Sequence, residues 1–143
     1  MSFDLKIINN DLVIQNGDLK KVNDSEKLIQ DILKLALTEA GTNPLHPWYG
    51  SFLSRSIIGS SLDEDILIQV GKSQLENALQ NLKSLQDMQI KTQQQVSADE
   101  QIAAISDISI IRSEADPRLF NITITVISKG VKPVTTSFRL STI

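Results

Sequence analysis

Apolar and polar residues alternate in short stretches over the first 22 residues of this chain, with two turn-forming pairs between them. Asn9-Asn10 and Asn16-Gly17 tolerate the positive φ that two-residue hairpin turns require. These turns would collect five apolar side chains on one face of a small sheet, namely Leu5, Ile7, Leu12, Ile14 and Leu19. Residues 1–22 therefore predict a three-stranded meander in which Ile7 faces Leu12 and Ile14 faces both Leu5 and Leu19. An unstructured polar arm is the alternative, but random placement would not align both hairpins at once.

The spacing of apolar residues becomes helical over residues 23–104. Asn23 precedes Glu26 by three residues, as in a capping box, and apolar residues then recur at helical spacing until Gly41 supplies a left-handed stop. This pattern predicts a core helix. A short second helix is expected around residues 52–58, with Gly59 ending it.

A long helix is predicted next. Ser61 and Glu64 match its start, and Gly71 is a place where it would bend. The helix would run from Leu62 to about Gln94, roughly 50 Å at 1.5 Å per residue, so we expect part of it to project. Its apolar stripe is predicted to hold Leu62, Ile66, Val70, Leu75, Leu79, Leu82 and Leu85. Ser97 with Glu100 then predicts a short capped turn of helix.

From residue 105 onward the period is that of strands. Apolar residues alternate first at Ile108 and Ile110, and then in two further segments that carry hydroxyl side chains on the other face. A two-residue turn at Lys129-Gly130 would place the two later apolar sets on opposite faces. A three-residue loop that includes Val131 instead opposes three apolar pairs, Val126 to Val134, Ile122 to Phe138 and Phe120 to Leu140. We therefore predict the second register.

These elements predict an α+β fold in one domain. Residues 1–22 would form the meander, residues 23–104 a helical region with two to three helices, and residues 105–143 an antiparallel C-terminal sheet. A sheet with one covered and one polar face has an edge available for a strand of another chain. The sequence does not tell which of the two edges is open.

Composition removes several classes of function. The chain has no cysteine, so disulfides, thiolate nucleophiles and the usual structural zinc sites are excluded. A net charge of −3 with scattered cations gives no footprint for a nucleic-acid backbone. No run of about 18 apolar residues indicates a membrane span, and no secretory leader is recognisable, so we expect a chain that stays soluble after synthesis in the cytosol.

The sequence contains no set of residues at a spacing that favours catalysis. The only histidine, His46, lies in a loop with no ligand or triad partner at a suitable spacing. Glu39 could act as a general acid, but glycosidic cleavage needs a second carboxylate or an equivalent group, and residues 40–62 contain none. Asp63-Glu64-Asp65 is typical of charges at a helix start rather than of a metal site. We expect no enzyme activity, no cofactor and no metal.

Two motifs favour contacts with partners. Pro47, Trp48, Tyr49 and Gly50 form a rigid loop with the only Trp and the only Tyr of the chain. Each aromatic side chain buries about 150–250 Å². For Trp48, core packing and partner binding are equally supported, whereas Tyr49 and the rigid Pro and Gly positions favour a loop shaped for docking.

The second motif is Asp116-Pro117-Arg118. The proline holds Asp116 extended and fixes its own φ, so the Arg118 guanidinium leaves the turn in a defined direction. Such a group suits a carboxylate or carbonyl cluster on a partner. An ordinary hairpin turn with an exposed arginine is the alternative.

Taken together, these motifs resemble the bacteriophage baseplate wedge family that initiates the contractile sheath, which is similar to the type VI secretion baseplate counterpart. The matching residues are Asp11-Leu12-Val13-Ile14, Gly17-Asp18-Leu19, Leu35-Ala36-Leu37-Thr38, Pro47-Trp48-Tyr49-Gly50 with Leu53, and the strands entered through Asp116-Pro117-Arg118. The family's usual Glu-Pro-Arg is Asp-Pro-Arg here, and the helix from Leu62 is unusually long and rich in Gln.

The resemblance implies a structural virion protein of the tail baseplate, assembled in the host cytoplasm, and not the lysozyme activity for which members are historically labelled. It implies about six copies per particle, which grip baseplate wedge proteins and offer a sheet edge to the tail sheath protein, with tail tube and hub proteins as further neighbours and no nucleic acid or membrane partner. The expected partner-binding residues are Pro47, Trp48, Tyr49, Gly50, Asp116, Pro117, Arg118, Ile122, Ile124, Val134, Thr136 and Phe138. A cell-wall hydrolase and an adaptor that dimerises through the Leu75 to Leu85 stripe are the alternatives.

Overall fold

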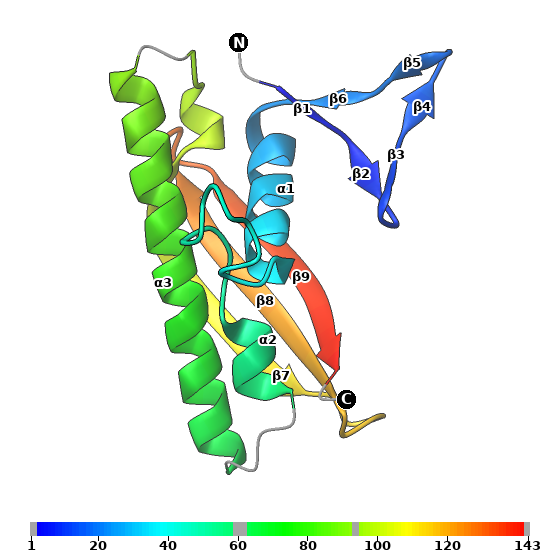
Figure 1. The fold of residues 1–143 in the computed structure, drawn as a ribbon, viewed down its shortest axis with the longest axis vertical. Coiled ribbons are helices and arrows are strands. Elements are labelled where there is room, and N and C mark those ends of the chain that lie inside the picture. Colours follow the sequence, from blue (N-terminus) through cyan, green and yellow to red (C-terminus); the bar gives the residue numbers. More distant parts are fainter. Residues whose placement is uncertain (1–2, 59–62, 93–94, 142–143) are drawn as a thin grey trace.

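The computed structural model describes residues 3–58, 63–92 and 95–141. A layer of helices covers one face of a three-stranded antiparallel sheet, and a small β-structure formed by the N-terminal residues projects from the start of the first helix (Figure 1). The predicted α+β class is confirmed, with a long helix among three and an antiparallel sheet at the C-terminal end.

The C-terminal sheet consists of β7 (Ile102–Arg112), β8 (Leu119–Ser128) and β9 (Pro133–Ser141), with β8 in the centre. The register between β8 and β9 is the predicted one, because Val126 faces Val134 and Ile122 faces Phe138. Val131 adopts a φ of 60°, so the loop residue that sets this register has a left-handed backbone. The two-residue alternative is wrong.

The helical layer contains α1 (Asp24–Leu37), α2 (Leu53–Ile57), α3 (Glu64–Lys91) and the single 3₁₀ turn η1 (Ala98–Glu100). In this layer α1 contacts β9, whereas α3 contacts β7. The apolar faces of sheet and helices meet in one core, whose most deeply buried side chains include Leu28, Ile32, Leu35, Leu53, Ile57, Leu75, Leu79, Ile102, Phe120, Ile122 and Ile124. The predicted short turn at Ser97 is confirmed, since the Glu100 carboxylate accepts the Ser97 N–H at 3.0 Å.

The long helix differs from its prediction in two ways. Its 28 residues span about 42 Å, and buried side chains occur from Leu67 to Gln86, so it lies along the sheet instead of projecting from it. Near its start the buried face holds Leu67 and Gly71, whereas Ile66 is largely exposed. Gly71 is the physical reason, because a Cβ there would lie 2.9 Å from the Ile110 Cδ1 atom, and the missing side chain lets the helix approach the sheet.

Some predicted boundaries lie outside the described residues. This applies to the helix stop at Gly59, to the start at Ser61 and Leu62, and to the end at Gln94. The described helix has Asp63 at its N-cap and Thr92 at its C-cap.

The N-terminal residues form a β-triangle and not a meander. Three short antiparallel pairs lie at its corners (Figure 1): β1 (Asp4–Leu5) with β6 (Lys21–Val22), β2 (Ile7–Ile8) with β3 (Asp11–Leu12), and β4 (Ile14–Gln15) with β5 (Asp18–Leu19). The predicted pairs Ile7 with Leu12 and Ile14 with Leu19 are confirmed, but Leu5 faces Lys21 and not Ile14.

A cyclic set of backbone hydrogen bonds closes the triangle. The Lys6 N–H donates to the Lys20 carbonyl at 2.8 Å, the Lys20 N–H to the Val13 carbonyl at 2.8 Å, and the Val13 N–H to the Lys6 carbonyl at 3.1 Å. These three residues stand seven positions apart. Each lies in the middle of a side, Lys6 between β1 and β2, Val13 between β3 and β4, and Lys20 between β5 and β6, so the two strands of a side pair with different partners and no continuous meander forms.

Candidate functional site

The outer edge of β9 carries main-chain groups with no partner strand among the described residues. Neighbouring residues of an antiparallel strand point their N–H and C=O groups in opposite directions. The Ser128 N–H donates to the Lys132 carbonyl at 3.0 Å, and from this bond the register directs the main-chain groups of Thr136 and every second neighbour toward β8. The outward-pointing groups belong to Thr135, Ser137 and Arg139, and all three side chains are exposed.

The outward-pointing residues belong to the polar face of the sheet. The Thr135 hydroxyl pairs with that of Thr125 at 3.2 Å, and the Ser137 hydroxyl pairs with that of Thr123 at 3.0 Å. At the start of the strand, Pro133 has no N–H to offer, so the donor edge begins at Thr135. The edge thus presents a short row of fixed hydrogen-bonding groups.

At the other edge of the sheet, side chains of α3 protect the first residues of β7. The Ile102 N–H donates to the Gln86 Oε1 atom at 2.8 Å, and the Lys83 ammonium donates to the Ala103 carbonyl at 3.0 Å. The register of β7 is also irregular between Ile102 and Asp107. Bulges and covered main-chain groups both hinder strand addition, so the two edges are not equivalent.

The residues predicted to bind a partner at the sheet have their side chains turned inward. Ile122 and Ile124 lie on the central strand and are fully buried, and Val134 and Thr136 are buried under the helices. Phe138 is partly buried against the same core. These side chains pack under the sheet, whereas the outward main-chain groups at its edge belong to the alternate residues Thr135, Ser137 and Arg139.

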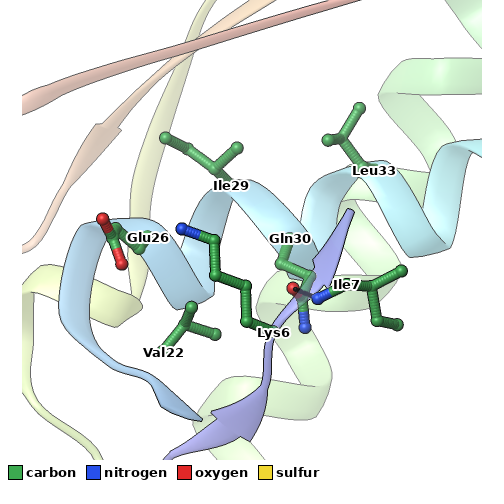
Figure 2. A pocket seen from close by; sticks show the side chains of 7 residues that line it. All are labelled: Lys6, Ile7, Val22, Glu26, Ile29, Gln30 and Leu33. Carbon is green, nitrogen blue, oxygen red and sulfur yellow. Dashed lines mark hydrogen bonds between the residues drawn. The ribbon is translucent and has the colours of Figure 1, made fainter. Parts of the chain in front are cut away.

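Gln30 of α1 attaches the β-triangle to the body. Its amide nitrogen donates to Asp4 Oδ2 at 2.8 Å and to the Leu5 carbonyl at 2.7 Å, and its amide oxygen accepts the Ile7 N–H at 3.0 Å. Figure 2 shows the hollow that this attachment leaves between the triangle and α1, which is lined by Lys6, Ile7, Val22, Glu26, Ile29, Gln30 and Leu33.

An ion pair supports this attachment. The Lys34 ammonium binds Asp4 and lies 3.5 Å from Asp31 Oδ1. Burial acts to raise the pKa of Asp4, but the hydrogen bonds from Lys34 and Gln30 outweigh burial and lower it. Burial acts to lower the pKa of Lys34, but Asp4 and Asp31 outweigh burial and raise it.

In the aromatic loop, the tryptophan is the exposed residue and the tyrosine the packed one. Trp48 is 42% exposed, and its ring meets those of His46 and Tyr49 edge-on, at centroid distances of 5.7 and 6.2 Å. Tyr49 packs against the core, and burial raises the pKa of its phenol although Lys34 opposes the shift. Of the two aromatic residues, Trp48 is therefore the one that offers a large free surface.

Gly50 and the residue that follows it hold the loop in place. Gly50 has a φ of 113°, and a Cβ there would lie 2.6 Å from the Thr38 carbonyl oxygen. Ser51 then donates its N–H to the Thr38 carbonyl at 2.9 Å and its hydroxyl to the Ala36 carbonyl at 2.8 Å. The glycine is needed for this close approach to the end of α1, and Pro47 lines the hollow beside Trp48.

The Asp116-Pro117-Arg118 turn joins β7 to β8 and is closed on itself. The Asp116 carboxylate accepts the Arg118 N–H at 3.0 Å and the Arg118 Nε–H at 3.2 Å. These bonds lower the pKa of Asp116, and the same ion pair raises that of Arg118. The turn lies at one end of the sheet and the aromatic loop lies in the helical layer (Figure 1), so the structure does not bring the two motifs together.

Residues with catalytic or metal-binding potential are dispersed in the part of the chain that the structure describes. The Glu39 carboxylate binds the Arg55 guanidinium. The described ranges contain no group of three acidic, histidine or cysteine side chains that could hold a metal ion. None of the described helices combines the length and the apolar character that crossing a membrane requires.

Comparison with known proteins found no match, either to a family model or to a curated protein.

Proposed function

We propose that this chain is a structural component of a contractile phage tail baseplate, which binds the wedge core bundle and starts sheath assembly by accepting a sheath strand at β9. The observation that carries the proposal is the row of outward main-chain groups at Thr135, Ser137 and Arg139. A strand added there would form main-chain hydrogen bonds with these groups in place of hydrogen bonds to water.

The difference between the two edges supports this choice. An unpaired edge is an aggregation hazard that proteins usually blunt. Side chains of α3 cover the main-chain groups at the start of β7. Among the described residues no such side chain is bound to the outward groups of Thr135, Ser137 and Arg139, and Pro133 protects only the first position of the strand. An edge kept open beside a protected one is what a strand acceptor requires.

The predicted wedge contacts lie apart from this edge. Trp48 offers an exposed indole on the helical layer, and Arg118 is an exposed cation at one end of the sheet. A chain that joins two kinds of partner needs separate surfaces, so that binding one does not exclude the other.

A proline and an alanine at Ser137 test the proposal. In tails assembled from the gene cluster that encodes this chain, Ser137→Pro removes one outward N–H, whereas Ser137→Ala removes the hydroxyl and keeps the N–H. We expect tubes without sheath for the proline variant and contractile tails for the alanine variant, as seen by electron microscopy. Normal sheathed tails from Ser137→Pro would refute the proposal.

Two other outcomes would favour the alternatives. Turnover of peptidoglycan by the purified chain that is lost in Glu39→Gln would indicate a hydrolase. A dimer through the Leu75 to Leu85 stripe would indicate an adaptor, although Leu75, Leu79 and Leu82 are buried in the chain's own core.

A further inference from the structure

Besides its core-facing side, α1 carries a second apolar stripe. Ile29, Leu33 and Leu37 follow one another at four-residue spacing, and Leu37 is 54% exposed. Figure 2 shows that the side chains of Ile29 and Leu33 leave the helix in the same direction. The core-facing residues of α1 are a different set, namely Leu28, Ile32, Leu35 and Ala36. Ile29 also packs partly against the core, whereas Leu37 at the other end of the stripe is largely exposed, so the stripe extends beyond the surface that the sheet covers.

The position of α3 determines where this stripe points. Lys27 and Asp31, on the opposite flank of α1, line a hollow together with Leu82 and Leu85 of α3. Since α3 contacts β7 and α1 contacts β9, the flank away from α3 faces the side of the sheet where β9 is the last strand. The stripe thus lies above the space that an added strand would enter.

The spacing of the stripe fits such a strand. Four residues of helix advance about 6 Å, and two residues of strand advance about 6.6 Å. Both α1 and β9 begin beside η1, because the Asp24 carboxylate accepts the Ser97 hydroxyl at 2.6 Å and the Gly130 N–H donates to the Ala98 carbonyl at 3.3 Å. The two elements therefore run in the same direction, and successive residues of the stripe match alternate residues of a strand.

We propose that this stripe selects the segment that adds to β9. The occupant is an extended segment of a partner protein with apolar residues at three alternate positions, which face Ile29, Leu33 and Leu37, and with polar residues between them. This inference rests on the proposed function, in that β9 accepts a strand, and adds what the strand must contain. A helix on the same flank would cover the stripe but leave the donors of Thr135, Ser137 and Arg139 without partners.

Selection from a displayed library of short random segments tests the inference on the purified chain. We expect enriched segments to carry apolar residues at alternate positions and to slow amide exchange at Thr135, Ser137 and Arg139. Leu33→Asp should weaken binding of an enriched peptide by about tenfold or more, since an unpaired carboxylate would face its apolar residues. Leu45→Asp, at an exposed loop position, is the matched control and should leave binding unchanged.

Circular dichroism of each variant checks its fold, and Leu37→Ser, at a more exposed position, provides a second and milder disruption. The inference fails if enriched segments lack the alternation, if none are enriched, if the three amides are not protected, or if binding is insensitive to both stripe variants. Tails that need the Ser137 N–H but tolerate both stripe variants would refute the inference and leave the proposed function standing. If the chain binds the selected peptides but plays no part in tail assembly, the proposed function is refuted and the selectivity of the stripe is retained.

Discussion

At the scale of single residues, Gln30 makes three hydrogen bonds between α1 and the side of the β-triangle formed by β1 and β2, and the Lys34 to Asp4 ion pair adds a further contact. The Gln30 amide satisfies an N–H, a carbonyl and a carboxylate oxygen that belong to three different residues. No hydrophobic pattern marks it, because in the sequence it is simply one more polar position on an amphipathic helix.

We predict that Gln30→Ala loosens the triangle without unfolding the body. Three hydrogen bonds are lost, and the free energy of unfolding should fall by about 1–2 kcal/mol. Amide exchange at Ile7, measured by NMR, should accelerate strongly while that of Ile124 stays slow. Gln80→Ala, on the exposed face of α3, is the control and should change neither. Unaltered exchange at Ile7 in Gln30→Ala would contradict the assigned role.

Substitutions at Gly50 and Gly17 distinguish two ways in which a side chain at positive φ destabilises the fold, namely backbone strain and collision with neighbouring atoms. Gly50→Ala meets both backbone strain and a collision with the Thr38 carbonyl, so we expect a loss of about 2–4 kcal/mol. Gly17→Ala, at a φ of 79° with open space around it, should lose about 1 kcal/mol from backbone strain alone. Urea unfolding measures both variants, and equal losses would show that the close approach at Gly50 is not important.

Because Glu100 is buried, we predict that the free energy of unfolding depends on pH. Its carboxyl group is buried, and its Oε2 atom has no hydrogen-bond partner among the described residues. Burial raises its pKa, and the hydrogen bond from the Ser97 N–H opposes the shift only in part. A group whose pKa is higher in the folded state favours folding below its unfolded pKa, and this advantage is lost as the pH rises through the folded pKa.

The variant Glu100→Gln should therefore be more stable than the wild type at pH 7, because the amide oxygen still accepts the Ser97 N–H and no charge is buried. The difference in the free energy of unfolding should shrink as the pH falls below the folded pKa. Urea unfolding of both chains across the acidic range measures it. A difference that stays constant with pH would exclude titration of Glu100 as the cause.

At the scale of elements, β9 has two sets of main-chain groups with different roles. The groups of Thr136 bond to β8, and those of Ser137 point outward. Sequence alternation assigns both residues to faces of the sheet, but it says nothing of the direction in the plane of the sheet, since every residue of a strand has the same main chain.

We expect Thr136→Pro and Ser137→Pro to differ in stability. A proline at Thr136 removes a hydrogen bond to β8 and disturbs a buried position, with a loss of about 3 kcal/mol or more. A proline at Ser137 leaves the bonds to β8 intact and should lose about 1 kcal/mol through the Thr123 hydroxyl pair and altered φ. Thermal unfolding compares the two, and an equally large loss at Ser137 would mean that its N–H is already bound within the chain.

A seven-residue repeat in the sequence encodes the β-triangle. Asp4, Asp11 and Asp18 stand seven residues apart, and each carboxylate accepts the N–H of the leucine that follows it, at 2.9, 2.8 and 3.1 Å. Hairpin turns and an alternating pattern predict the two pairings next to the turns. The seven-residue repeat points to three equivalent sides, and neither the turn residues nor the alternation of apolar and polar positions contains this information.

At the scale of the whole molecule, one hydrophobic core joins α1, α2 and α3 to the sheet. The apolar stripe of α3 from Leu75 to Leu85, through which an adaptor would dimerise, packs in this core. Leu82 is 5% exposed, in contact with the core that also contains Phe120 and Val126. The same residue pattern fits both uses, because a stripe on a helix records only that something apolar covers it.

Leu82→Ala should therefore act on folding and not on association. We expect a loss of about 2–5 kcal/mol in the free energy of unfolding, as for other large buried side chains. The thermal midpoints of wild type and variant should be independent of protein concentration, which calorimetry at several concentrations measures. A midpoint that rises with concentration in the wild type and not in the variant would instead indicate a dimer held by this stripe.

Local periods and turn chemistry are sufficient to predict several features of this chain from the order of its residues. The period of two divides each C-terminal strand into a buried and an exposed face, and the loop with Val131 fixes the register between β8 and β9. Ser97 and Glu100 encode their own cap, because all the groups involved lie within four residues. These features depend on neighbours in the chain, so the order of residues is sufficient to predict them.

Contacts between distant segments determine that the start of β7 is covered and that Trp48 is the exposed aromatic residue of its loop. Gln86 and Lys83 cover β7 because α3 crosses it, and Gly71 sets how closely that helix approaches. Tyr49 rather than Trp48 packs on the core because the loop docks against the end of α1. Each outcome depends on contacts between segments far apart in the chain, and the spacing of residues along one segment carries no information about which other segment will cover it.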